Sequence, residues 1–262
     1  MITPARRRRA RIAAFTGALA LAVTGIVLGA WRPWVPAVSD APVLAAEDVV
    51  IAPAPLALPE HPRVLVFGDS WTYGSAASAP TLGYAYVLAE LIDGETIVDG
   101  VRGSGYLKPG IDGPAYGERI ASLEADIEPD LVIVQGSIND RAQGAVGYRE
   151  AVTAAWDALA ATYPGATIVV LGPAPHVLPV EAGTDRIDRD LTALAEARGW
   201  AYISPVADDW ITEANYLDVI AVDPGNRHPS TEGHRYLAEK LAAALADLSV
   251  APVTEAGPPA PQ

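Results

Sequence analysis

The sequence predicts an α/β fold in three layers (α/β/α), in which helices cover both faces of a five-stranded parallel sheet. Short runs rich in Val, Leu and Ile, typical of buried strands, alternate five times with longer segments typical of helices. Such alternation implies parallel strands joined by helical crossovers. Half of the 262 residues are hydrophobic, so a sizeable core can be buried.

The individual elements follow from this alternation in order along the chain. The expected strands are 64–67, 96–98, 131–135, 167–171 and 201–204. The expected helices are 84–92, 116–127, 148–163, 184–198 and 230–248. Together they define one domain over 63–248. From 249 to 262 the Pro, Gly and Ala content predicts a short disordered tail.

The N-terminal quarter differs from this domain in composition. Residues 1–11 include five arginines, and 12–31 form an uncharged run of 20 residues, long enough as a helix to span about 30 Å of bilayer. We expect a transmembrane signal anchor with 1–11 in the cytoplasm and the domain outside, at the cell membrane. Secretion after signal-peptide cleavage is the alternative. Residues 32–62 are rich in Pro and Ala and predict an extended stalk.

Charge and composition exclude several classes of function. The net charge is −14, and six arginines but no acid precede Asp40, so the rest of the chain carries −20. This balance argues against a nucleic-acid partner. Cysteine is absent, which excludes disulfides, thiolate metal sites and a Cys nucleophile. The four histidines (His61, His176, His228 and His234) lack zinc-ligand spacing, so we expect no metal and no cofactor.

Three short motifs indicate nucleophilic catalysis. Gly68-Asp69-Ser70 ends the first expected strand, where an α/β fold presents reactive groups in a crevice. A serine is a weak nucleophile and needs a base. His228, just ahead of the last expected helix, is the candidate. Asn139 follows the strand at 131–135 and can donate hydrogen bonds from its amide.

With these motifs the chain resembles the SGNH (GDSL-like) hydrolases, including secreted or membrane-anchored esterases of actinobacterial type, over roughly 63–248. The resemblance implies a flavodoxin-like sheet, Ser70 as nucleophile and His228 as general base. It also implies an oxyanion hole made by the Ser70 N–H, the Asn139 amide and a glycine N–H. Gly103 is our choice for that glycine, with Gly105 as the alternative.

Two positions depart from the family pattern. The family has Gly two residues before the Asn, where this chain has Ser137. The family's acid precedes the histidine by three residues, where this chain has Gly225. The nearest acid before His228 is Asp223, at a distance of five residues. Either Asp223 orients the imidazole across a loop extended by two residues, or the enzyme works as a Ser70–His228 dyad.

The sequence therefore predicts a serine esterase that forms an acyl-enzyme and acts on acylated glycans or small esters at the cell envelope. An O-acyltransferase using the same acyl-enzyme and a catalytically silent binding module are the alternatives. Four aromatic residues are candidates for lining an acyl or sugar pocket, although such residues are more often part of the core: Trp71, Tyr73, Tyr106 and Trp210. We expect the other three histidines to be structural or solvated.

Overall fold

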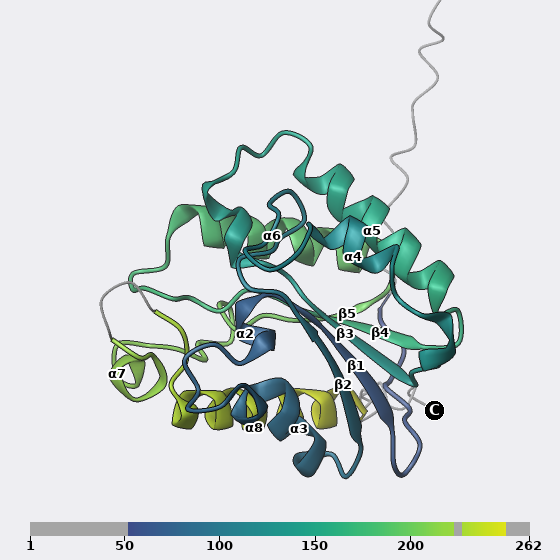
Figure 1. Cartoon of the computed structure of the whole chain (residues 1–262), viewed down its shortest axis with the longest axis horizontal. Helices are drawn as coiled ribbons and strands as arrows, with labels where there is room; N and C mark the ends of the chain where they lie inside the picture. Colours follow the sequence, from purple (N-terminus) through teal and green to yellow (C-terminus); the bar gives the residue numbers. More distant parts are fainter. Residues whose placement is uncertain (1–51, 223–226, 250–262) are drawn as a thin grey trace, which may run out of the picture. The chain divides into compact units, whose positions relative to one another are not determined.

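The computed structural model describes residues 52–222 and 227–249. Its centre is a sheet of five parallel strands in the order β2-β1-β3-β4-β5 (Figure 1). The strands are β1 (Arg63–Gly68), β2 (Glu95–Gly100), β3 (Leu131–Gln135), β4 (Thr167–Leu171) and β5 (Ala201–Ile203). This is the flavodoxin-like order, and it confirms the predicted parallel sheet.

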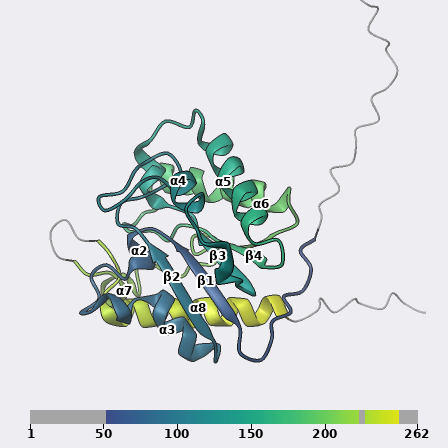
Figure 2. The same cartoon turned by 45° about the vertical axis from the view of Figure 1, so that its right-hand side comes forward.

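Helices cover both faces of the sheet, as Figures 1 and 2 show. On one face lie α3 (Tyr84–Leu91) and α8 (Thr231–Ser249), and on the other α4 (Tyr116–Ile120), α5 (Tyr148–Thr162) and α6 (Ala182–Glu196). The described residues also form short helices: α2 (Ser70–Tyr73), α7 (Tyr216–Val219) and the 3₁₀ turns η1 (Pro80–Leu82), η2 (Ala125–Ile127) and η3 (Ile138–Ala142).

The strands alternate their side chains between two separate cores. Val64 and Val66 of β1 pack into the core under α3 and α8, whereas Leu65 and Phe67 pack into the core under α5 and α6. All four side chains are fully buried. Because both faces of the sheet are covered, the strands appear in the sequence as continuous apolar runs.

Strand register brings the site residues to one edge of the sheet. Phe67 of β1 lies beside Val134 of β3, so the two strands end at the same level. From β1 the chain continues to β2 on one side and then crosses to β3 on the other side, so the strand order reverses between β1 and β3. Ligands of such sheets bind at this switch point. The segments after β1 and β3 therefore lie next to each other although they are more than 60 residues apart.

One predicted helix is wrong in its extent. The segment 116–127 forms not one helix but α4, a turn, and then η2. The hydroxyl of Tyr163 donates to the carbonyl of Glu124 (2.9 Å), which takes an acceptor that a continuous helix would use. Glu128 then adopts left-handed backbone with φ of 45° and ends the segment. The remaining predicted helices and strands agree with the structure within two residues at each end.

Several predictions about the termini lie outside the described residues: the segments 1–11 and 12–31, most of the stalk at 32–62, and the tail beyond Ser249. Within the described part of the stalk, Leu56 is buried and its N–H donates to the carbonyl of Leu248 (2.8 Å). Across residues 52–222 and 227–249, no helix combines the length and apolar character needed to cross a bilayer.

Candidate active site

Ser70 and His228 lie in direct contact at the carboxyl edge of the sheet. The Ser70 Oγ is 2.8 Å from Nε2 of His228, although 158 residues separate them. Ser70 is the first residue of α2, and the carboxylate of Asp69 caps that helix by accepting from the Trp71 N–H (2.9 Å). Gly68 permits this turn, because a Cβ at that position would lie 2.7 Å from Oε1 of Gln135.

His228 comes from the connection between α7 and α8. Its carbonyl accepts from the Ala221 N–H (2.8 Å), and the following Pro229 forms an isolated bridge with Ile220. Two residues on, the hydroxyl of Ser230 accepts from the Gly233 N–H (2.9 Å) in the first turn of α8. The start of α8 thus sets the direction of the histidine. Asp223 lies outside the described residues, so its proposed contact with the ring stays a prediction.

Asn139 stands in η3, directly after β3, and borders the same cavity as Ser70. Its amide Nδ2 donates to the carbonyl of Ser104 (3.0 Å) and, at the longer distance of 3.3 Å, to Oδ2 of Asp69. Ser137, which replaces the family's glycine, is fully buried, and its hydroxyl accepts from the Asn139 N–H (3.0 Å). The same hydroxyl donates to the carbonyl of Ser104 (2.7 Å). The serine therefore adds an anchor for Asn139.

The two candidate glycines have different surroundings. Gly103 has a left-handed backbone (φ 75°) and borders the cavity beside Ser70. The Gly105 N–H donates to the carbonyl of Lys108 (2.8 Å), and its Cα faces the carboxylate of Asp140. For the Gly103 N–H, no acceptor exists in the described part of the chain. The geometry thus favours Gly103 over Gly105 as the oxyanion donor.

Asp140 is a supporting residue that the sequence did not single out. Its buried carboxylate accepts from the N–H groups of Tyr106 (2.7 Å), Lys108 (3.1 Å) and Leu107 (3.2 Å). Burial raises its pKa, and these three bonds oppose the rise. The residue therefore fastens the loop that carries Gly103 to the segment that carries Asn139. Its position directly after Asn139 was the only signal in the sequence.

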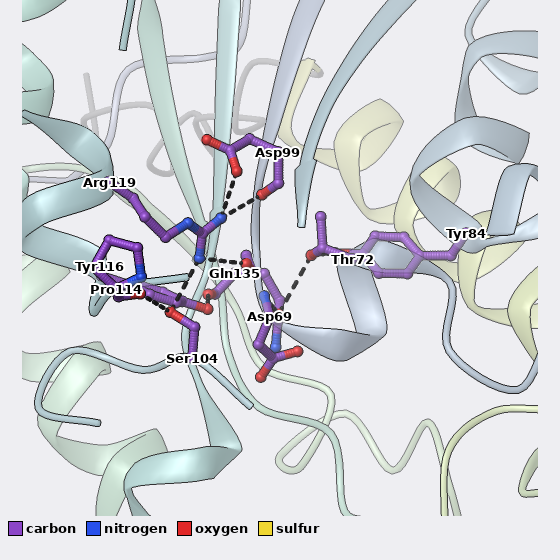
Figure 3. Close-up of polar contacts among 10 residues, drawn as sticks. Asp69, Thr72, Tyr84, Asp99, Ser104, Pro114, Tyr116, Arg119 and Gln135 are labelled. Carbon is purple, nitrogen blue, oxygen red and sulfur yellow. Dashed lines mark hydrogen bonds and ion pairs between the residues drawn. The ribbon is translucent and has the colours of Figure 1, made fainter. Parts of the chain in front are cut away.

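Arg119 is a second supporting residue, and Figure 3 shows its contacts. The buried guanidinium donates to the carbonyl of Gly68 (2.8 Å), to the hydroxyl of Ser104 (3.2 Å) and to Oδ1 of Asp99 (2.7 Å). It also lies over the ring of Phe67, 4.1 Å from the centroid. One cation therefore connects the residue before Asp69-Ser70 with the loop after β2.

Gln135, the last residue of β3, holds the same turn from the other side. Its Oε1 accepts from the Asp69 N–H (3.2 Å) and from the Thr72 hydroxyl (3.3 Å) (Figure 3). The Thr72 hydroxyl also pairs with that of Tyr84 (2.8 Å). Burial raises the pKa of Asp69 to about 6, and hydrogen bonds from Trp71 and Ser137 and the charge of Arg119 oppose this rise.

Two cavities meet at Ser70, and both also reach Asn139 and His228. The larger, of about 740 Å³, extends over α2 and the loop at 102–111. The smaller, of about 340 Å³, extends toward Arg141, His176 and Arg227. An ester bond placed at the Ser70 hydroxyl can therefore direct one half of the molecule into each cavity.

The four candidate aromatic residues have different outcomes. Tyr73 borders the larger cavity and Trp71 the smaller. Tyr106 belongs to the core, where its hydroxyl accepts from Nε1 of Trp156 (2.8 Å). Trp210 is buried and borders a void of about 20 Å³. The described residues contain no cluster of His, Cys, Asp or Glu placed to hold a metal ion.

A family model and a curated relative match most of this chain. The model of the GDSL-like lipase/acylhydrolase family matches residues 66–236. A GDSL lipase of Mycobacterium tuberculosis is 28% identical over 192 residues, which cover 68% of this chain and 79% of the lipase.

Solved structures share the fold at lower identity. An aryl esterase of M. smegmatis has a TM-score of 0.54 at 20% identity, covering 71% of this chain and 99% of the esterase. A carbohydrate acetylesterase family member from Sinorhizobium meliloti has a TM-score of 0.55 at 17% identity, covering 72% and 99%.

Proposed function

The chain belongs to the GDSL-like lipase/acylhydrolase family and is an SGNH-type serine esterase, and we propose that it cleaves carboxylic esters through an acyl-enzyme on Ser70. The observation that carries this mechanism is the 2.8 Å contact between Ser70 Oγ and His228 Nε2 at the junction of two open cavities. A neutral imidazole at this distance can accept the hydroxyl proton.

In the first half of the reaction, Ser70 Oγ attacks the ester carbonyl while His228 takes its proton. The C–O bond to the alcohol then breaks, and His228 returns the proton to the leaving alkoxide. In the second half, His228 deprotonates a water that attacks the acyl carbon. The C–O bond to Ser70 then breaks, the carboxylic acid leaves, and His228 returns the proton to Ser70 Oγ. Each proton that leaves is returned, so no metal or cofactor is needed.

The oxyanion of each tetrahedral intermediate requires preorganised donors. We assign the N–H groups of Ser70 and Gly103 and the amide of Asn139 to this role. When the substrate oxygen binds, the Asn139 amide donates to it and gives up its longer hydrogen bond, the one to Asp69. Asp223 is our candidate for orienting His228, since it is the nearest acid that precedes the histidine in sequence.

Acylated glycans and small esters at the cell envelope are the proposed substrates. Support for them comes from the open 740 Å³ cavity, from the predicted anchor at 12–31, and from relatives named as aryl esterases and a carbohydrate acetylesterase family member. The same acyl-enzyme can pass its acyl group to a sugar hydroxyl in place of water, which would make the protein an O-acyltransferase.

The test is covalent labelling combined with turnover. The wild-type protein should react with a fluorophosphonate probe and hydrolyse short-chain p-nitrophenyl esters, and Ser70→Ala should do neither. A Ser70→Ala protein that kept wild-type turnover would end the assignment. Adding acylated and free glycans to the wild type distinguishes transfer from hydrolysis by the product formed.

A further inference from the structure

The arginines of the domain are almost all neutralised. Ten lie in the described residues, and eight of them form ion pairs with carboxylates. The two without such a pair, within the part of the chain that the structure describes, are Arg227 and Arg235. Arg235 is exposed on α8. Arg227 directly precedes His228 and borders the smaller cavity at Ser70.

The described residues that line this cavity include two arginines and no acidic side chain. Besides Ser70, Asn139 and His228, it includes Arg141 and Arg227. Glu181 pairs with Arg141 (2.9 Å) and lies 3.9 Å from Nε2 of His176, so the charge of that arginine is balanced. The charge of Arg227 has no such partner among the described residues. On a chain whose net charge is −14, this is an unusual place for an unneutralised cation.

His176 forms the inner wall of the same cavity. Its side chain is buried, and Nδ1 has no hydrogen-bond partner in the described part of the structure. The hydroxyl of Tyr216 donates to the His176 carbonyl (2.7 Å) and holds its backbone. Burial, followed by the charge of Arg141, lowers the pKa of His176 to about 4, against the opposing charge of Glu181. The ring is therefore neutral and can donate to a ligand or accept from it.

We propose that Arg141, His176 and Arg227 form an anion subsite, which binds a carboxylate or phosphate group of the substrate next to the ester bond. The proposal rests on the proposed esterase function and narrows its substrates to esters with an anionic group. The net charge of the chain is negative, so an unpaired cation beside the nucleophile favours a substrate with an anionic group at this point. The same cavity contains Ser70, so both groups fit within one ligand.

The test compares matched esters that differ in one charge. p-Nitrophenyl hydrogen succinate and its neutral match, p-nitrophenyl methyl succinate, place the charge on the acyl half. p-Acetoxybenzoate and methyl p-acetoxybenzoate place it on the alcohol half. The measured quantity is kcat/KM for the anionic ester divided by kcat/KM for its neutral match. For at least one pair, Arg227→Gln should lower this ratio by about fivefold, because one partly exposed charge pair contributes about that much. The pair that responds identifies the half that enters the subsite.

Two further variants control this measurement. Arg227→Lys keeps the charge and should restore most of the ratio, and both substitutions keep a long unbranched side chain on the left-handed backbone at this position (φ 47°). Arg235→Gln removes the same charge from the other unpaired arginine, outside both cavities, and should leave the ratio unchanged. Equal ratios in the wild type, Arg227→Gln and Arg235→Gln for both pairs would overturn the proposal.

A binding measurement separates failure of the subsite from failure of the esterase function. The Ser70→Ala protein cannot form the acyl-enzyme, so calorimetry can give its dissociation constant for p-nitrophenyl hydrogen succinate and for p-acetoxybenzoate. For the anion that the subsite accepts, adding Arg227→Gln should weaken binding by about the same fivefold. If the wild type hydrolysed no ester, the esterase mechanism would fail, while this comparison would still decide whether the subsite exists.

Discussion

The two halves of the active site are built in different ways. The nucleophile half consists of the segments after β1 and β3, where Asp69 and Asn139 belong to a buried network that includes Arg119 and Gln135. The base half is the connection from α7 to α8, where the backbone around His228 is held by the Ala221 N–H and the bridge at Pro229. The nucleophile half is part of the core, and the base half lies against the core.

Because of this difference, substitutions in the two halves should affect stability and turnover differently. A buried polar group on the nucleophile half has partners that are left unsatisfied when it is removed, so its loss lowers both stability and turnover. The His228 side chain on the base half is only half-buried, so water can reach the groups around it when it is removed. Its loss should lower turnover and change stability little.

The largest effect should come from the base half. His228→Ala removes the proposed proton acceptor and should lower kcat by about 10⁴- to 10⁶-fold, with a change of less than about 1 kcal/mol in the free energy of unfolding. Ester turnover and urea unfolding measure the two quantities. The double variant Ser70→Ala/His228→Ala should be no slower than either single variant, because the two residues act as a unit. Additive losses would show that they act independently.

The oxyanion side should give the next largest effect. Asn139→Ala removes one proposed donor and should lower kcat by about 10²- to 10³-fold with little change in KM, because the donor acts on the transition state. It should also lower stability by about 1 kcal/mol, since Asn139 anchors Ser104 and Asp69. A variant that loses substrate affinity with kcat intact would mean that Asn139 binds the substrate ground state.

The same contrast explains what the sequence predicts and what it does not. The ranges of β3 and β4 agree to the residue, because apolar runs buried on both faces leave no other assignment. Ser70, Asn139 and His228 stand in short local motifs, and the structure places all three around one cavity.

Arg119 and Gln135 stand in no such motif. Their roles depend on partners 51 and 66 residues away, and only the folded sheet shows these contacts. Likewise, α2 is too short at four residues to produce a helical period.

Arg119 gives the most direct test of the buried network. Arg119→Met removes a guanidinium that is only 5% exposed in its side chain, while Asp99 is 32% exposed and can regain some water. We expect a loss of about 3 kcal/mol in stability, at the low end for a broken buried pair. Displacement of the turn at Ser70 should also lower kcat about tenfold to a hundredfold.

Arg149→Met is the matched control for this variant. Arg149 pairs with Asp190 (3.1 Å), but its side chain is half exposed, so its loss should cost less than about 1 kcal/mol. If Arg119→Met and Arg149→Met lost the same stability, the buried network would contribute no more than a surface ion pair, which would contradict our expectation.

The smallest expected effect concerns His234, which joins the two halves. The residue lies on α8, six positions after His228, and its ring is fully buried and stacked on Tyr84. Nδ1 accepts from the Tyr84 N–H (3.2 Å), so Nε2 must carry the hydrogen that it donates to the Ser75 carbonyl (3.0 Å). Protonation would place two donors against each other at Nδ1 and loosen α8 from the turn after α2.

This arrangement makes stability depend on pH in a direction that can be derived. Burial lowers the pKa of His234 from 6.5 to about 4, so between these values the unfolded chain binds more protons than the folded one. The contribution of His234 to stability is therefore complete above pH 6.5 and decreases as the pH falls toward 4. Between pH 7.5 and 5 the loss should be about 2 kcal/mol.

His234→Gln can isolate this contribution, because a glutamine amide can accept from Tyr84 and donate to Ser75 without titrating. The difference in unfolding free energy between wild type and variant should therefore move by about 2 kcal/mol in favour of the variant on going from pH 7.5 to 5. Urea unfolding at several pH values measures it. His61→Gln, which changes an exposed histidine at the opposite end of the strands, is the parallel control for the loss of a histidine far from α8. Parallel stability curves for wild type and His234→Gln would mean that the ring does not hold α8 to the nucleophile half in its neutral form.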